Sequence, residues 1–290
     1  MYALDPPEKA WKHFSALFDL TPLRMFKNSG SIENYTWIAG TSVFAQVSLD
    51  GNLHYHTDDH LSRSGDLLFV HRYLTGGADG RSGDVPYMMR PGSIIFHDYG
   101  RPFEGVQMPS TIQSVFLRHD LVGYDPNRMP PQLVFDQSSS VGAALFSTFD
   151  TLMDAFLGGA TTLEIARERH LASLVNAALP EPDARPSSQM QIQQYIESAL
   201  PNPALRETDI QSTFELSRAQ LFERFSAYGG FSQYVSTRRV FHTLLGIEKS
   251  PDRLAHVSEI ATDWGFRSED AFRDAVQGLY QTDLETMFAR

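Results

Sequence analysis

Residues 256–272 read HVSEIATDWGFRSEDAF, and this stretch decides the fold of the C-terminal part of the chain. Val257 and Ala261 are one helical turn apart, on one apolar face of a short helix. Gly265 can take the left-handed conformation that ends a helix. Ser268 stands where the N-cap of a second helix belongs. The stretch therefore predicts two short helices joined by a tight turn, which is a helix-turn-helix.

An earlier copy of the same pattern occupies residues 205–228. Ile210 and Phe214 predict the inner face of a first helix. Ser217 is the expected N-cap of a second helix, whose apolar face begins at Leu221.

Residues 231–247 separate the two copies and have the apolar periodicity of a connecting helix. The whole arrangement resembles the AraC/XylS family of transcription regulators, in which seven helices carry two helix-turn-helix units joined by one long helix. The resemblance covers about residues 189–290 and rests on two motifs at the right separation. It implies a protein that binds promoter DNA.

The N-terminal half has a different pattern. Short apolar or alternating runs recur over residues 33–120, separated by turn signals, and they predict a β-sandwich or small barrel. Residues 90–103, RPGSIIFHDYGRPF, resemble a stretch of the AraC-binding-like ligand domain, a cupin-type β-barrel. That resemblance implies a domain that senses a small-molecule effector.

Helical periodicity appears twice more, as an amphipathic helix over residues 6–19 and a helical pair over residues 141–179. One apolar stripe of the pair is expected to form either a dimer seam or a face packed on the barrel. The residues of this stripe are Leu145, Phe149, Leu152, Met153 and Phe156.

The fold class expected from these patterns is α+β. Residues 1–180 are expected to form a cupin-like β-barrel with flanking helices, an effector-sensing and dimerisation domain. Residues 181–188 are polar and proline-rich and predict a linker. Residues 189–290 are expected to form the all-α domain with two helix-turn-helix units.

Composition limits the function and the compartment. The 290 residues contain no cysteine, which excludes disulfides and thiol catalysis and favours a reducing cytoplasm. No apolar run reaches roughly 18 residues, so no membrane span is expected. The start of the chain lacks the pattern of a signal peptide. Net charge is −11, of which residues 186–290 contribute −4, from 10 Lys/Arg against 14 Asp/Glu.

The two expected recognition helices depart from the family pattern. Glu223 and Asp274 stand where the family has arginines that face DNA. Acidic side chains can accept a hydrogen bond from cytosine N4, but they repel phosphate. A regulator that acts by protein contact, with weakened DNA binding, is therefore one alternative. The residues expected at the DNA are Arg218, Ala219, Phe222, Glu223, Arg267, Ser268, Asp270, Arg273 and Asp274.

A histidine cluster is the strongest chemical signal in the N-terminal half. His54 and His56 are two residues apart, so on a strand both point to one face. With His97 they are the expected ligand-binding residues, without metal or cofactor. The alternative is a cupin-type metalloprotein or enzyme in which His60 completes a facial metal site with these three. The chain lacks the G-x-S-x-G elbow of the α/β-hydrolases, and no enzyme is expected.

The sequence thus predicts a cytoplasmic, ligand-responsive AraC/XylS-type transcription regulator. Promoter DNA, RNA polymerase and a small-molecule effector are its candidate partners, and a homodimer is its expected state.

Overall fold

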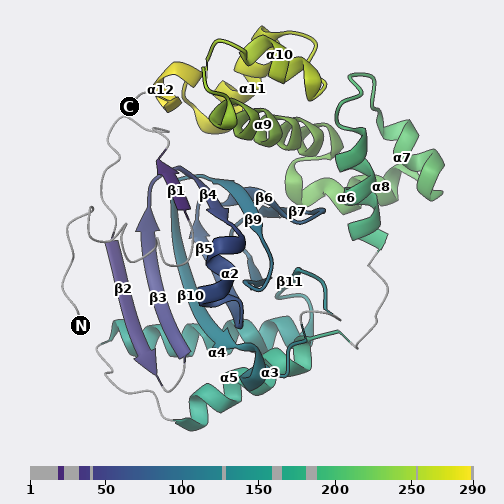
Figure 1. Cartoon of the computed structure of the whole chain (residues 1–290). Coiled ribbons are helices and arrows are strands. Elements are labelled where there is room, and N and C mark those ends of the chain that lie inside the picture. Colours follow the sequence, from purple (N-terminus) through teal and green to yellow (C-terminus); the bar gives the residue numbers. More distant parts are fainter. Residues whose placement is uncertain are drawn as a thin grey trace. The chain divides into compact units, whose positions relative to one another are not determined.

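The computed structural model describes residues 19–22, 33–39, 42–125, 129–158, 165–180, 188–252 and 254–288. Two compact units make up the chain (Figure 1). The first consists of Met1–Pro22, Gly30–Ala78 and Met89–Arg185, and the second of Leu23–Ser29, Asp79–Met88 and Pro186–Arg290. Residues 6–18 of the predicted N-terminal helix and residues 181–187 of the predicted linker lie outside the described residues.

The first unit is built on antiparallel strands, as predicted for residues 33–120. Its six-stranded sheet has the order β11-β8-β5-β10-β3-β2. These strands are β2 (Glu33–Ala39), β3 (Ser42–Leu49), β5 (Leu67–Thr75), β8 (Ser93–Asp98), β10 (Ser110–Arg118) and β11 (Gln132–Asp136). In a second sheet β1 (Asp19–Pro22), β4 (Asn52–His56) and β9 (Phe103–Gln107) are neighbours in that order.

Helices α2 (Asp58–Ser64), α3 (His119–Val122), α4 (Ser140–Leu157) and α5 (Ile165–Ala178) complete the described part of this unit. The apolar stripe of α4 packs into the core of the six-stranded sheet, and the rings of Phe44 and Phe156 lie 4.9 Å apart. All five residues of the stripe are at most 2% exposed. Because they are buried within one chain, they form the face packed on the sheet and not a dimer seam.

The second unit contains both predicted helix-turn-helix units. Its helices are α6 (Ser188–Ala199), α7 (Glu207–Phe214), α8 (Arg218–Phe225), α9 (Phe231–Lys249), α10 (Val257–Asp263), α11 (Glu269–Tyr280) and α12 (Leu284–Phe288). Helix α9 is the predicted connecting helix, and α7–α8 and α10–α11 are the two motifs. Among the described helices, none combines the length and the hydropathy that a membrane-spanning helix requires.

A segment from the N-terminal half also belongs to this second unit. Asp79–Met88 includes most of strands β6 (Ala78–Ser82) and β7 (Val85–Met89). Arg238 of α9 is fully buried and donates hydrogen bonds to the carbonyls of Gly80 (2.8 Å) and Tyr87 (3.3 Å). No local signal in residues 79–88 predicts this association, and the predicted division at residues 181–188 places them in the first domain.

Arg238 also anchors an ion cluster between helices. Its guanidinium donates to both carboxylate oxygens of Glu197 on α6, at 2.6 and 3.0 Å. His242 contacts the same carboxylate at 2.7 Å and stacks on Trp264, with ring centroids 4.0 Å apart. Burial alone would raise the pKa of Glu197, but Arg238 and His242 outweigh it and hold that pKa at about 2. The cluster therefore fixes α6, α9 and the turn after α10 against one another.

Candidate nucleic-acid interface

The first helix-turn-helix is held by its apolar inner face. Ile210 of α7 and Leu221 and Phe225 of α8 are buried together. The side chain of Ser217 accepts a hydrogen bond from the Gln220 N–H at 3.2 Å, and the Gln220 side chain accepts one from the Ser217 N–H at 2.9 Å. This reciprocal cap fixes the start of α8.

Helix α8 presents four of the residues predicted to face DNA. Arg218, Ala219, Phe222 and Glu223 are all exposed. Phe222 is 69% exposed, although a phenylalanine side chain gains free energy when it leaves water. A large apolar side chain on the outer face of a recognition helix can contact a thymine methyl group.

The second helix-turn-helix turns at Gly265, as the sequence predicts. The φ angle of Gly265 is +83°, and a Cβ at this position would lie 2.2 Å from the carbonyl oxygen of Leu200. Ser268 caps α11 by accepting a hydrogen bond from the Ala271 N–H at 3.2 Å. Phe272 and Val276 are buried on the inner face. Only glycine satisfies both the backbone angle and the close approach.

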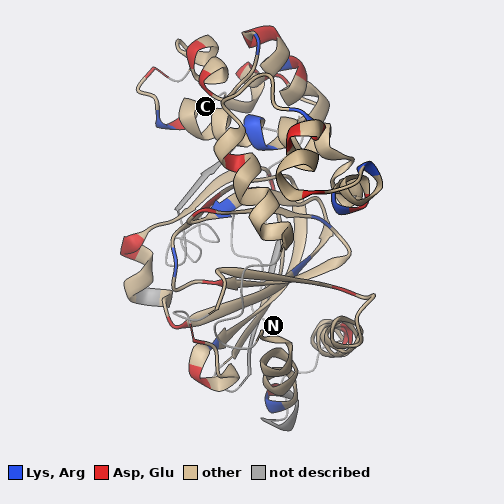
Figure 2. Cartoon of the chain, turned by 90° about the vertical axis from the view of Figure 1, so that its right-hand side faces the viewer, with Lys and Arg blue, Asp and Glu red and all other residues tan. Residues whose placement is uncertain are grey.

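The outer side of α11 carries two of the predicted residues, and two more precede it. Asp270 and Asp274 are exposed on the helix, and Arg267 and Ser268 are exposed just before it. Arg273 is half-buried. Acidic side chains recur along the helices of this unit (Figure 2).

Arg273 differs from the other predicted cations because carboxylates already hold it. Its Nε donates to Glu269 at 2.7 Å, and its Nη1 donates to both oxygens of Glu285, at 2.7 and 3.0 Å. The hydrogen bond that Arg273 donates to Glu269, with those that it donates to Glu285, raises the pKa of Arg273. Glu285 lies in α12, outside both motifs, so the helix-turn-helix pattern gives no signal for it.

The connecting helix sets the separation of the two motifs. Helix α9 has 19 residues, which corresponds to roughly 28 Å at 1.5 Å per residue. That length is comparable with the ~34 Å between successive major-groove faces of B-DNA. A rigid connection of this length suits two recognition helices that enter neighbouring grooves of the same duplex.

The predicted histidines of the first unit are brought together, but in a packed interior. His54, His56, His60 and His97 are all buried. His56 Nε2 lies 2.9 Å from the carbonyl oxygen of Tyr99, and the Nδ1 of His60 accepts a hydrogen bond from the Thr57 N–H at 3.0 Å. These bonds fix the two imidazoles in structural roles.

Metal binding receives no support from this geometry. Within the described ranges, no group of three or more His, Asp or Glu side chains is placed to hold a metal ion. His97 instead packs on Phe103, with ring centroids 4.5 Å apart. The four histidines named for the metalloprotein alternative therefore do not converge on a common point.

A fifth histidine, His71 on β5, joins this interior and was not singled out by the sequence. It is 3% exposed, neither of its ring nitrogens has a hydrogen-bond partner, and its ring lies 6.4 Å from that of His97. Burial lowers the pKa of His71 to about 3, with repulsion from His54 adding to the effect. Burial also lowers the pKa of His54 to about 4, although Glu104 opposes that shift. The interior therefore holds several neutral imidazoles.

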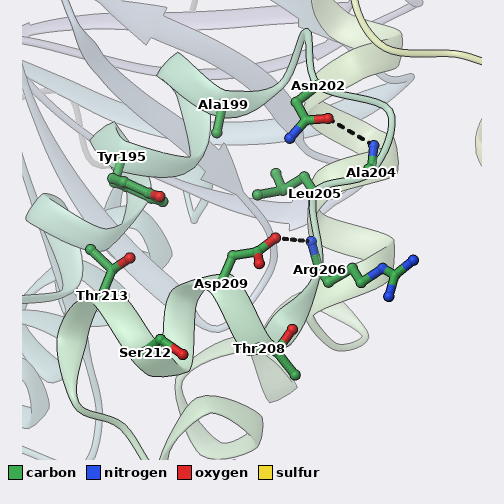
Figure 3. Close-up of a pocket in the computed structure, with 10 residues that line it drawn as sticks. All are labelled: Tyr195, Ala199, Asn202, Ala204, Leu205, Arg206, Thr208, Asp209, Ser212 and Thr213. Atoms are coloured by element: carbon green, nitrogen blue, oxygen red, sulfur yellow. Dashed lines mark hydrogen bonds between the residues drawn. The ribbon is translucent and has the colours of Figure 1, made fainter.

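A pocket of about 580 Å³ lies between α6 and α7 (Figure 3). Two of its polar side chains accept hydrogen bonds from backbone N–H groups. Asn202 accepts a hydrogen bond from the Ala204 N–H at 3.0 Å, and Asp209 accepts one from the Arg206 N–H at 2.8 Å. The pocket is therefore lined by a loop that these two hydrogen bonds hold in place, on the surface of the first motif. Its lining residues are Tyr195, Ala199, Asn202, Ala204, Leu205, Arg206, Thr208, Asp209, Ser212 and Thr213.

Comparison with known proteins bears on the fold. No protein-family model matches the chain, and no curated protein matches it in sequence. A structure of ToxT from Vibrio cholerae aligns with 94% of this chain and 99% of its own at 14% identity, with a TM-score of 0.36. The structure of the AraC-like transcriptional activator CuxR aligns with 88% of this chain and 94% of its own, at 18% identity and a TM-score of 0.50. The chain therefore shares the fold of the AraC-like transcriptional activator CuxR.

Proposed function

We propose that this chain is a sequence-specific DNA-binding transcription regulator of the AraC/XylS type. The observation that carries the proposal is the pair of capped helix-turn-helix motifs joined by α9, in a chain that shares the fold of CuxR over most of its length. The DNA-contacting residues we propose are those exposed on and before α8 and α11. Arg218 and Arg267 are the exposed cations among them.

We propose a small-molecule effector for the first unit. His54, His56 and His97 lie together against the ring of Phe103 in its interior, and a small ligand with both apolar and polar parts would have to displace part of this packing to reach them. A homodimer would raise the DNA affinity of an acidic protein by engaging two sites at once. Promoter DNA, RNA polymerase and the effector are the partners of this proposal, and the cytoplasm is its compartment.

The test is DNA selection by the full chain, followed by a variant. Random-sequence duplexes are enriched on the purified protein at low salt, and a recurring motif is the expected result. Arg218→Ala should then weaken binding to that motif and lower the slope of log K against log salt by about 1, because one phosphate contact is lost. Arg206→Ala removes an exposed arginine from the N-cap of α7 and serves as the control.

A regulator that acts by protein contact is favoured by one observation, the acidic second motif. The second motif, residues 257–280, carries five Asp/Glu and two Arg, a net of −3. The first motif, residues 205–228, carries four Asp/Glu and three Arg, a net of −1. If no duplex is enriched and Arg218→Ala changes nothing at low salt, this second function replaces the first.

A further inference from the structure

Helix α12 places a carboxylate against the arginine of the second recognition helix. Leu284 and Met287 are buried, which docks α12 on the unit. Asp283 accepts a hydrogen bond from the Thr286 N–H at 2.6 Å and so caps the helix start. Glu285 is thereby held where both of its oxygens bind Nη1 of Arg273.

The first recognition helix has no comparable arrangement. Arg218 is exposed in the first turn of α8, and in the part of the chain that the structure describes no carboxylate pairs with it. The two recognition helices therefore differ in whether the arginine on each that is predicted to face DNA, Arg218 or Arg273, is available to a phosphate before DNA arrives.

We infer that Glu285 competes with DNA phosphate for Arg273 and so limits the affinity of the second helix-turn-helix. A phosphate oxygen that approaches Arg273 must displace a carboxylate that already makes two charge-assisted hydrogen bonds. It must also approach a motif, residues 257–280, of net charge −3. The first motif then contributes most of the DNA affinity. The second motif binds DNA only at base sequences whose contacts compensate for the loss of the ion pair between Glu285 and Arg273. This inference rests on the proposed function.

Glu285→Gln tests the inference, with Glu259→Gln as the matched control. Glu259 is an exposed carboxylate on α10 of the second motif, and both variants remove one negative charge. The probe is a 40-base-pair random-sequence duplex, titrated with the full chain at several salt concentrations. Glu285→Gln should bind roughly three- to tenfold more tightly, with the salt slope increased by about 0.9, because one more cation becomes available to phosphate. Glu259→Gln should change affinity less than twofold.

Arg273→Ala distinguishes loss of the ion pair from a change in net charge as the cause of the tighter binding. In the native background it should change affinity less than twofold, whereas in the Glu285→Gln background it should abolish the gain. Equal gains from Glu285→Gln and Glu259→Gln would show a net-charge effect and overturn the inference while leaving the proposed function intact. Failure of every variant, and of the native chain, to bind the duplex would remove the proposed function and the inference with it.

Discussion

Among single residues, His71 shows most clearly how burial changes the pKa of a side chain. It is buried beside His54 and His97, in an interior where desolvation favours neutral imidazole over imidazolium. An unfolded histidine has a pKa near 6.5. The unfolded chain therefore takes up protons as the pH falls below 6.5, while the folded chain does not until the pH approaches 4, the pKa of His54.

The free energy of unfolding should therefore fall as the pH is lowered from 6.5 towards 4 and stay level above 6.5. At pH 5, about 1.5 units below the pKa of an unfolded histidine, each such buried histidine lowers the free energy of unfolding by roughly 2 kcal/mol, because one unit corresponds to about 1.36 kcal/mol. Urea unfolding followed by circular dichroism at pH 7.5, 6 and 5 measures this slope. His71→Phe should reduce it, and His170→Gln, which changes an exposed histidine on α5, should not. Identical slopes in all three proteins would contradict the assignment.

At the scale of single elements, the turn between α10 and α11 depends on one glycine. Gly265→Ala would impose a left-handed φ on an L-residue and place its Cβ against the carbonyl oxygen of Leu200 and the guanidinium of Arg239. The expected loss of stability is about 2 kcal/mol or more. The measurement is the midpoint of chemical denaturation.

Gly278→Ala on α11 provides the matched comparison. No atom lies within 4 Å of a Cβ built at Gly278, and the residue is helical. Alanine should therefore stabilise the chain by about 0.5–1 kcal/mol through higher helix propensity. A loss from both substitutions would mean that the second motif does not tolerate any added methyl group, and that the special role given to Gly265 is wrong.

At the scale of the whole molecule, the second unit is assembled from separate parts of the chain. It includes Asp79–Met88 as well as Pro186–Arg290. A protease that cuts within the proline-rich residues 181–187 should yield two pieces on a denaturing gel. These pieces should nevertheless elute together from a native sizing column, because Asp79–Met88 of one piece packs within the unit formed by the other.

Arg238→Met should let the nicked pieces separate. The substitution removes the bonds to the carbonyls of Gly80 and Tyr87 and leaves Glu197 without its main partner, and breaking a buried pair costs about 3–5 kcal/mol. Arg239→Met is the control, because Arg239 binds only the carbonyls of Leu200 and Asn202 on the same piece. Separation of the native nicked pieces would show that the Asp79–Met88 association is weak.

Much of the second unit could be predicted because its signals are local. The spacing of Val257 and Ala261, the caps at Ser217 and Ser268, and the left-handed turn at Gly265 each act within about four residues, so a short stretch of sequence specifies them. The α+β class and the packing stripe of α4 follow from periodicity in the same way.

The remaining features were decided by tertiary structure. Gly80 lies 158 residues from Arg238 along the chain, and no periodicity joins them. His71 reaches the histidine interior through strand pairing with β8, and Glu285 reaches Arg273 because α12 folds back on α11. Residue type and spacing specify helices and turns, because hydrogen bonds and caps are short-range. The partner of a buried or ion-paired side chain depends on which distant segments pack together, and a pattern read along one stretch of chain does not contain that information.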